Sequence, residues 1–198
     1  MIKWCFQRVE QCHKIDKIIL ATSKNTLDDP LEDFCKLNNI IIYRGSLDNV
    51  VERFCKVLNK YQSDRFFRIN GDSPFLDSSL LDRAAKISET HNADIITNVF
   101  PKTFPKGQSV ELIKSDFFLS QSRYITRNYD KEHVTPYFYK NSNSFKIINF
   151  SNDVNMCHFQ TSIDTPQDFK TAEKYIDKFS LSTDWLSVVK GLNDTERC

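Results

Sequence analysis

Strand-like and helix-like segments alternate four times in the first hundred residues, and this alternation limits the fold more than any other feature of the chain. Each strand-like segment is a short apolar run, whereas each helix-like segment places apolar residues at helical spacing. The strand-like segments are 17–22, 40–43, 65–69 and 93–98, and the helix-like segments are 2–12, 30–37, 48–58 and 78–85. Such alternation predicts an α/β domain with a mostly parallel sheet sandwiched by helices.

The regular alternation ends near residue 99. A loop with two prolines and a glycine is followed by a short strand at 109–113, and residues 115–140 are helical, rich in aromatic side chains and interrupted at Pro136. The remaining expected elements are a strand at 144–150, a helix at 165–179 and a short helical piece at 185–189. The aromatic side chains of 115–140 suit either a buried core or an oligomer face, and their spacing favours the core.

Charge and glycine content exclude several classes of protein. The net charge of +1 argues against a broad surface for nucleic acid or membranes, and no apolar run is long enough to span a bilayer. The first ten residues do not form a signal peptide. Glycine occurs only at 45, 71, 107 and 191, which excludes the glycine-rich dinucleotide and P-loop motifs. We therefore expect a cytoplasmic protein with no nucleic-acid or membrane partner.

The cysteine pattern points to a reducing compartment. The six cysteines stand at 5, 12, 35, 55, 157 and 198, and no two form a CxxC pair. Four of them lie in apolar helical segments, where a free cysteine acts as a small buried hydrophobe. Without paired ligand spacing, a zinc site is not expected.

Two aspartates follow predicted strands, at the positions where an open α/β sheet binds ligands. Asp72 lies in "RINGDSPFLD", and Asp164 lies in "SIDTP" before a predicted helix. Two such carboxylates could share a magnesium ion, which proteins often hold with one or two carboxylates and substrate phosphates. The alternative is that Asp72 begins a turn and Asp164 caps the helix ahead of Pro166, and composition alone favours this alternative.

Five segments in register strengthen the functional interpretation. They are "KIILATSKNTLDDPLEDFCKLNNIIIYRGSLDNVVERF", "RINGDSPFLDSSLLD", "KTFPKGQSVEL", "KEHVTPYFYKN" and "SIDTPQDFK". Together they resemble the cytidylyltransferase family that makes CMP-activated sugars, most closely its spore coat polysaccharide biosynthesis branch. The resemblance covers about residues 1–178. It implies a nucleotide-diphospho-sugar transferase-like, Rossmann-like fold, cytoplasmic and usually dimeric.

The resemblance also implies a reaction and a set of residues. CTP and a sugar acid of the acylneuraminate or Kdo type would give a CMP-sugar and pyrophosphate, with Mg²⁺ as cofactor. By position, Asp72 and Asp164 match the catalytic, metal-binding aspartates. Arg44, Ser46, Asn70 and Gly71 match the nucleotide-binding residues, and Lys106, Glu111 and His133, together with Lys102, match the substrate-binding region. For the two lysines the alternative is a solvated loop position, and for His133 it is a structural role.

The same resemblance divides a single domain, 1–198, by role. Residues 1–98 form the nucleotide-binding half, 99–150 the sugar-binding and dimer segment, 151–179 the second metal aspartate with a closing helix, and 180–198 a tail. The face of the expected homodimer would thus come from the aromatic segment, which is one of the two alternatives stated above.

The start of the chain departs from the family pattern. Relatives begin with a strand, a triphosphate loop resembling ARxxSxRxPxK and a GKPMI-like turn, whereas "MIKWCFQRVE" resembles the helix after that turn. We therefore expect an N-terminally truncated fold with impaired activity, as a fragment, a misassigned start or a decayed protein. Ser109 stands where relatives are expected to carry an acidic residue. Two alternative functions follow: a non-catalytic remnant serving as a binding or assembly subunit, and a nucleotidyltransferase with another base or sugar.

Overall fold

The computed structural model describes residues 1–193, with the side chains described through residue 192. Contacts divide the chain into two compact units, each assembled from separate stretches of sequence. Unit 1 contains Met1–Ile15, Phe67–Leu112 and the described residues from Ile147 onward, and unit 2 contains Asp16–Phe66 and Ile113–Lys146. The division of the sequence by role into 1–98, 99–150, 151–179 and 180–198 stays a prediction, and the end of its last segment lies outside the described residues.

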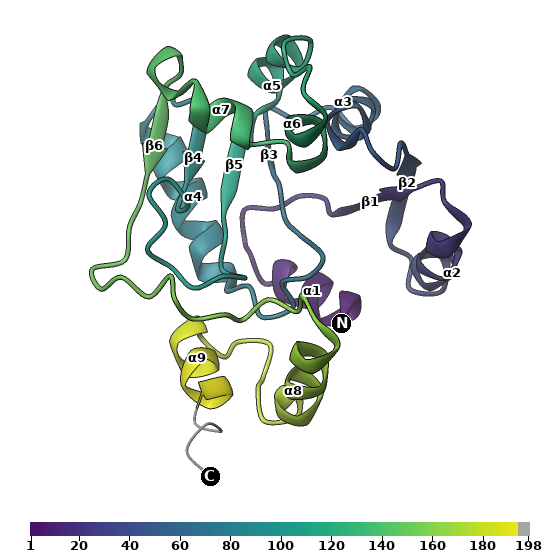
Figure 1. The fold of residues 1–198 in the computed structure, drawn as a ribbon, viewed down its shortest axis with the longest axis vertical. Helices are drawn as coiled ribbons and strands as arrows, with labels where there is room; N and C mark the ends of the chain where they lie inside the picture. Colours follow the sequence, from purple (N-terminus) through teal and green to yellow (C-terminus); the bar gives the residue numbers. More distant parts are fainter. Residues whose placement is uncertain (194–198) are drawn as a thin grey trace. The chain divides into compact units, whose positions relative to one another are not determined.

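Unit 2 begins with two parallel strands, β1 (Ile19–Ser23) and β2 (Ile41–Gly45), paired from Ile19 with Ile41 to Ser23 with Gly45. The short helix η1 (Thr26–Asp28) and helix α2 (Asp29–Leu37) connect them, and α3 (Val50–Lys60) follows. Helix α3 begins where the sequence permits a cap, because Asn49 accepts a hydrogen bond from the backbone N–H of Glu52 at 3.0 Å. Figure 1 shows these elements in purple and blue.

The aromatic segment forms the rest of unit 2. Its helices are α5 (Ser115–Ser122), α6 (Asn128–His133) and α7 (Pro136–Lys140), followed by η2 (Ser142–Ser144). Phe118 stacks edge-on against Phe54 and Phe66, while Phe117 contacts Phe138 and Phe145. The core interpretation therefore holds for the phenylalanines. Tyr124 and Tyr129, by contrast, are about half exposed, at 52% and 56%.

Unit 1 contains most of the larger sheet, whose strand order is β3-β5-β4-β6. The strands are β3 (Arg65–Phe67), β5 (Glu111–Lys114), β4 (Ile95–Thr97) and β6 (Ile147–Asn149), and the boundary between the units falls inside β3 and β5. Strands β4 and β6 are parallel. Ile95 and Ile96 point to opposite faces yet are both completely buried, as expected for a strand covered on both sides.

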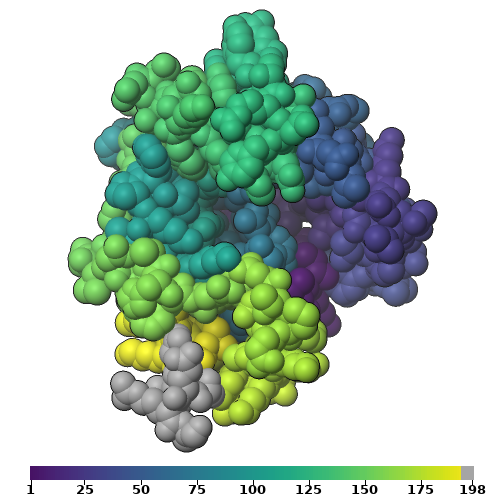
Figure 2. Space-filling model, in the orientation of Figure 1, coloured from purple at the N-terminus to yellow at the C-terminus, as the bar shows by residue number. Residues whose placement is uncertain are grey.

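Four helices complete unit 1: α1 (Ile2–Val9), α4 (Ser78–Thr90), α8 (Pro166–Ile176) and α9 (Trp185–Asn193). Helices α8 and α9 pack around a core of Phe75, Ala172 and Val188. Figure 2 shows their surface in yellow-green and yellow. Arg8, only 2% exposed, joins α1 to this region by donating hydrogen bonds to the carbonyls of Leu76, Ser180 and Thr183.

The structure confirms the α/β class and the parallel pairing of two strand pairs, but the strands lie in two sheets instead of one. Helix α1 ends at Val9, three residues short of its predicted end, and Cys12 is buried beyond it. Cys5, Cys12 and Cys35 are buried and free, as predicted, whereas Cys55 is only half-buried and Cys198 lies outside the described residues. Within residues 1–193, no helix is both long and apolar enough to cross a membrane.

Candidate active site

The loop that carries Asp72 is fixed on both sides by unit 1. At its far end Asp77 caps α4, because its Oδ1 accepts from the Ser79 N–H and its Oδ2 from the Trp185 N–H, both at 2.9 Å. Beneath the loop the Cys5 thiol contacts the carbonyl oxygens of Asn70 and Ser73, each at 3.7 Å. Burial, with a smaller contribution from the charge of Asp72, raises the pKa of Cys5 to about 11, so the thiol is neutral at pH 7.

Asp72 itself leaves its carboxylate partly open. The side chain is half-buried, and its Oδ1 accepts one hydrogen bond, from the Ser73 hydroxyl at 2.8 Å. Its backbone carbonyl accepts from the Ile163 N–H at 2.8 Å, which joins the Asp72 loop to the segment that carries Asp164. The two predicted metal aspartates therefore lie on loops held together by a backbone hydrogen bond.

The cap of α8 is Thr165, so the alternative in which Asp164 caps this helix is wrong. Thr165 and Asp168 form a reciprocal capping box, with the Thr165 hydroxyl accepting from the Asp168 N–H at 3.1 Å. The Asp168 carboxylate also accepts from the backbone N–H of Asp164 at 3.0 Å. Since the helix start is already satisfied, the carboxylate of Asp164 is available for other contacts.

Asp164 uses that carboxylate to bind Lys106. The Lys106 ammonium donates to Asp164 Oδ2, which also accepts from Gln160 Nε2 at 2.9 Å. The hydrogen bond to Asp164 is the main cause of a raised pKa of Lys106, and the negative charges of Asp164, Asp72 and Asp168 add to it. The carboxylates of Asp164, Asp72 and Asp168 therefore all act on the ammonium group of Lys106.

A glycine fixes the backbone beneath Lys106. Gly107 has φ +94°, and a Cβ atom there would lie 2.5 Å from the Ser162 nitrogen and 2.6 Å from the Thr161 hydroxyl. The Lys106 N–H donates to Phe159 O at 2.9 Å, and the Thr161 N–H donates to Lys106 O at 2.7 Å. Glycine is therefore required for this close approach of two backbone segments.

Two other residues of the predicted substrate region have different surroundings. Lys102 is half-buried, and burial together with the charge of Lys106 lowers its pKa. Glu111 is only 3% exposed and forms an ion pair with Arg68 at 2.8 Å. The substrate contact predicted for Glu111 stays a prediction, but its carboxylate already has a charged partner inside unit 1.

In unit 2 the predicted nucleotide residue Arg44 is used within the fold. Its guanidinium donates to the carbonyls of Ser23 at 2.9 Å and Asn25 at 2.7 Å. It also forms ion pairs with Asp29 at 2.7 Å and Glu32 at 2.6 Å, and these two carboxylates raise the pKa of Arg44. Arg44 therefore holds the end of β1 against the start of α2.

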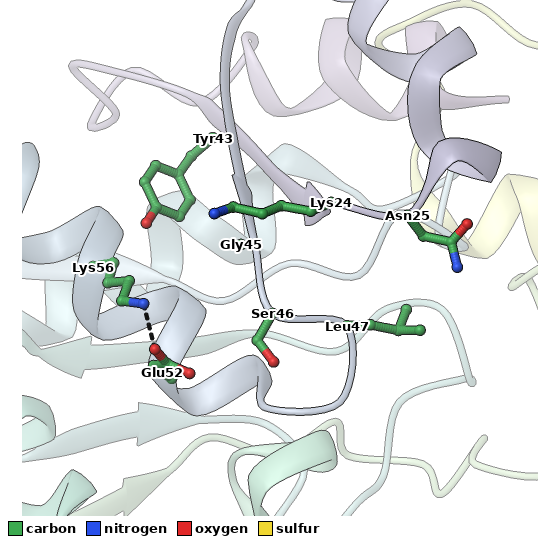
Figure 3. Close-up of a pocket in the computed structure, with 8 residues that line it drawn as sticks. All are labelled: Lys24, Asn25, Tyr43, Gly45, Ser46, Leu47, Glu52 and Lys56. Carbon is green, nitrogen blue, oxygen red and sulfur yellow. Dashed lines mark ion pairs between the residues drawn. The ribbon is translucent and has the colours of Figure 1, made fainter.

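Ser46, the other predicted nucleotide residue of unit 2, lines a cavity of about 410 Å³. The lining residues are Lys24, Asn25, Tyr43, Gly45, Ser46, Leu47, Glu52 and Lys56. Figure 3 shows the Lys24 side chain extending past Gly45 toward the Tyr43 ring, while Lys56 is joined to Glu52 by an ion pair. Lys24 and Lys56 were not among the sequence-predicted site residues, although Lys24 follows β1 at a strand exit.

His133 is exposed at the end of α6, with its ring 4.3 Å from the ring of Tyr129. The next residue, Val134, is buried and has φ +70° and ψ −62°, and the Thr135 N–H donates to His133 O at 2.9 Å across it. This is a γ-turn in a conformation that a β-branched residue adopts only under strain. The fold thus fixes the backbone at His133, while its predicted contact with the sugar stays a prediction.

The structure brings together only part of the predicted site. In unit 1, Lys106 contacts Asp164, whose loop is hydrogen-bonded to the Asp72 loop, and Asn70 and Gly71 are exposed beside Asp72. Sequence reasoning missed Gln160, a second donor to Asp164, whose only signal is its position four residues earlier. Among the described residues, no group of three or more His, Cys, Asp or Glu side chains could hold a metal ion. A metal here would take its remaining ligands from water or from a substrate.

Comparison with solved structures first defines the class of protein. A cytidylyltransferase from Leptospira borgpetersenii has a TM-score of 0.91 at 23% identity, with 98% of this chain and 83% of that chain covered. CMP:2-keto-3-deoxy-manno-octonic acid synthetase, solved with CTP, has a TM-score of 0.65 at 11% identity and covers 89% of this chain and 87% of that chain. A Mycobacterium tuberculosis protein solved with manganese has a TM-score of 0.59 at 12% identity, with 85% of this chain and 83% of that chain covered. The fold is that of the nucleotidyltransferases.

Sequence comparison then identifies the family. The cytidylyltransferase family model matches residues 1–193, so the chain belongs to the cytidylyltransferase family and is a nucleotidyltransferase. The uncharacterized protein MJ1063 of Methanocaldococcus jannaschii is 30% identical over 83% of this chain and 67% of its own length. The spore coat polysaccharide biosynthesis protein SpsF of Bacillus subtilis is 25% identical over 82% of this chain and 68% of its own length.

Proposed function

We propose that this cytidylyltransferase transfers CMP from CTP to a sugar acid of the acylneuraminate or Kdo type, in the synthesis of a surface polysaccharide. The observation that carries the proposal is the pair of carboxylates, Asp72 and Asp164, on loops joined by the hydrogen bond from Ile163 N–H to Asp72 O. The similarity to a spore coat polysaccharide protein supports the polysaccharide role. The fold shared with a synthetase solved with CTP supports the nucleotide.

The residues present fit a divalent cation. Asp72 and Asp164 both offer carboxylate oxygens that reach solvent, and Mg²⁺ takes few protein ligands when substrate phosphates supply the rest. When bound, Mg²⁺ would neutralise the triphosphate and stabilise the charge that develops on the phosphorus. A protein of this fold solved with manganese supports a divalent cation at such a site. We propose Mg²⁺ as the cation for this chain.

In the proposed reaction, a sugar hydroxyl oxygen forms a bond to the α-phosphorus of CTP. The bond from that phosphorus to the bridging oxygen breaks, pyrophosphate leaves and the hydroxyl proton passes to solvent. The chain's part is chiefly to position the two substrates, which is the main source of rate in such transfers. We assign Asn70, Gly71, Arg44 and Ser46 to the nucleotide and Lys102, Lys106, Glu111 and His133 to the sugar acid. Of these, Arg44 and Glu111 would act indirectly, by positioning the residues with which they already form ion pairs.

The test is pyrophosphate release from CTP with Mg²⁺, measured across a panel of eight-carbon and nine-carbon sugar acids. One member of the panel should give release that depends on both the sugar and the metal. Asp72→Asn should then lower the rate by about 10³-fold, a transition-state cost of about 4 kcal/mol, because the transition state loses a charge that positions its metal ion.

Two outcomes would count against the proposal. No release with any sugar acid would favour a non-catalytic binding or assembly subunit, and release with another nucleoside triphosphate would favour another base. Full activity in Asp72→Asn would remove the metal role alone. We further propose that the protein is a homodimer and lies in the cytoplasm. Sedimentation equilibrium would test the dimer, which should give twice the mass of the 23.2 kDa chain.

A further inference from the structure

The carboxylate of Asp164 is neutralised by a residue of the chain itself. The Lys106 ammonium donates to Asp164 Oδ2, and the pair remains accessible, with 51% of the Lys106 side chain and 30% of the Asp164 side chain exposed. The other donor to that oxygen, Gln160, is uncharged. Among the ion pairs of residues 1–193, Lys106 is the cation paired with Asp164. One positive charge therefore occupies an oxygen that a metal ion would need.

Only the side chain of Lys106 is free to leave. Its backbone is fixed on both sides, by hydrogen bonds to Phe159 and from Thr161 and by the close approach of Gly107 to Ser162. The ammonium, by contrast, ends a flexible four-carbon stem at an exposed position. It can therefore move away from Asp164 while the loop that carries Asp164 keeps its place.

We propose that Lys106 is a built-in counter-ion of Asp164, which a divalent cation displaces and which then faces the anionic groups of the bound substrates. This inference rests on the proposed function, because it takes Asp164 as a metal ligand. An ammonium and a divalent cation on the same carboxylate oxygen would repel each other strongly at such short range. The exchange keeps Asp164 paired in both states, next to the negative charges of Asp72 and Asp168.

This arrangement has a consequence for metal binding without substrate. The metal ion must compete with an ammonium that is already in contact with Asp164, so its affinity for the free protein is low. Once a triphosphate or a sugar carboxylate is bound, the released ammonium gains a new anionic partner, and the exchange becomes more favourable. Lys106 thereby couples metal binding to substrate binding, a linkage that acts equally in both directions.

The test measures Mn²⁺ binding to the whole chain without nucleotide, from the electron paramagnetic resonance signal of the free ion. Lys106→Met keeps the aliphatic stem and removes the charge, and it should bind Mn²⁺ about tenfold more tightly than the wild type, since a nearby positive charge is gone. Lys86→Met is the control, because it removes the same charge from an exposed lysine of α4 in unit 1 whose electrostatic partner among residues 1–193 is Glu89 and not Asp164. It should change the affinity less than about twofold.

The outcomes separate this inference from the proposed function. If Asp164→Asn abolishes Mn²⁺ binding but Lys106→Met does not tighten it, Asp164 is a metal ligand and the counter-ion role is wrong. If Asp164→Asn and Asp72→Asn both leave the affinity unchanged, the metal site itself is wrong. Absence of binding by wild type and Lys106→Met alike, up to millimolar Mn²⁺, also overturns the counter-ion role. Lys106→Gln gives a second neutral variant should Lys106→Met fail to fold, as judged by its thermal midpoint.

Discussion

Two strand-exit regions of the molecule use aspartates in opposite ways. After β1 in unit 2, the Asp28 carboxylate accepts three hydrogen bonds to one oxygen: from the Thr22 hydroxyl at 2.7 Å, the Ser23 N–H at 3.0 Å and the Ser23 hydroxyl at 2.6 Å. In unit 1, the Asp72 carboxylate accepts one, from the neighbouring Ser73 hydroxyl. Both aspartates follow a strand, but the Asp28 carboxylate accepts three hydrogen bonds and the Asp72 carboxylate accepts one.

The difference separates a structural aspartate from Asp72, which we propose as a metal ligand. Asp28 is bound by residues close in sequence, and those hydrogen bonds lower its pKa and keep it ionised. Asp72 accepts a single hydrogen bond, whereas the half-exposed Lys106 donates to Asp164, which also accepts from Gln160 and Ser162. The number of local donors, which the position after a strand does not reveal, distinguishes Asp28 from Asp72.

The largest effect on stability should come from the glycine that supports the unit 1 site. Gly107→Ala should cost about 3 kcal/mol or more, because it combines a positive φ with a Cβ atom 2.5 Å from backbone. Gly45→Ala, at the end of β2 in unit 2, is the matched variant, since its Cβ would meet the Arg53 side chain at 2.9 Å and no positive φ is involved. It should cost about 1–2 kcal/mol. Urea unfolding of both variants measures the difference.

A second contrast tests whether Asp28 and Asp72 differ as their partners indicate. Asp28→Ala should lower the free energy of unfolding at pH 7 by about 1–2 kcal/mol, since three hydrogen-bond donors lose their acceptor. Asp72→Ala should change it by no more than about 0.5 kcal/mol. Equal losses in the two variants would remove the distinction on which the proposed site depends.

The pH dependence gives this contrast a second readout. The pKa of Asp28 is lower in the folded protein, so its contribution to stability is complete above the ordinary aspartate pKa of about 4. It is lost as the pH falls through the lower pKa of the folded state. The difference between wild type and Asp28→Ala should therefore be constant from pH 7 to about pH 5 and shrink below about pH 4. A difference that persists unchanged in acid would point to lost packing.

Sequence patterns predicted the local structure well because short-range physics decides it. The alternation of segments gave the α/β class and parallel pairing of β1 with β2, and helical spacing placed Cys5, Cys12 and Cys35 inside. Helix and strand ends were displaced by a few residues where tertiary contacts decide them, as at the end of α1. The assignment of strands to two sheets was not predictable, because hydrophobic patterns do not specify which strands pair.

The site was predictable only where a residue type and its position determine the chemistry. Asp72 and Asp164 were predicted as metal ligands from the family resemblance together with their positions after strands; the structure joins their loops, and their metal role stays a prediction. The partners of Arg44 and Glu111 were not predictable, since Arg44 meets Glu32 12 residues away and Glu111 meets Arg68 43 residues away. Such contacts arise from the fold, and a motif alone does not show whether a charged group is already paired.

The smallest expected effect concerns Ser46, which lines the unit 2 cavity. If Ser46 contacts the nucleotide, Ser46→Ala should raise the KM for CTP about threefold, close to the cost of one neutral hydrogen bond, and leave kcat nearly unchanged. The Ser46 hydroxyl also accepts from the Asn49 N–H at 3.1 Å, so loosening of α3 could produce the same change. Asn49→Ala, which removes the cap of α3 outside the cavity lining, controls for this. A KM raised equally in both variants would show that Ser46 acts by supporting α3. A KM raised only in Ser46→Ala would show that the Ser46 hydroxyl contacts the nucleotide.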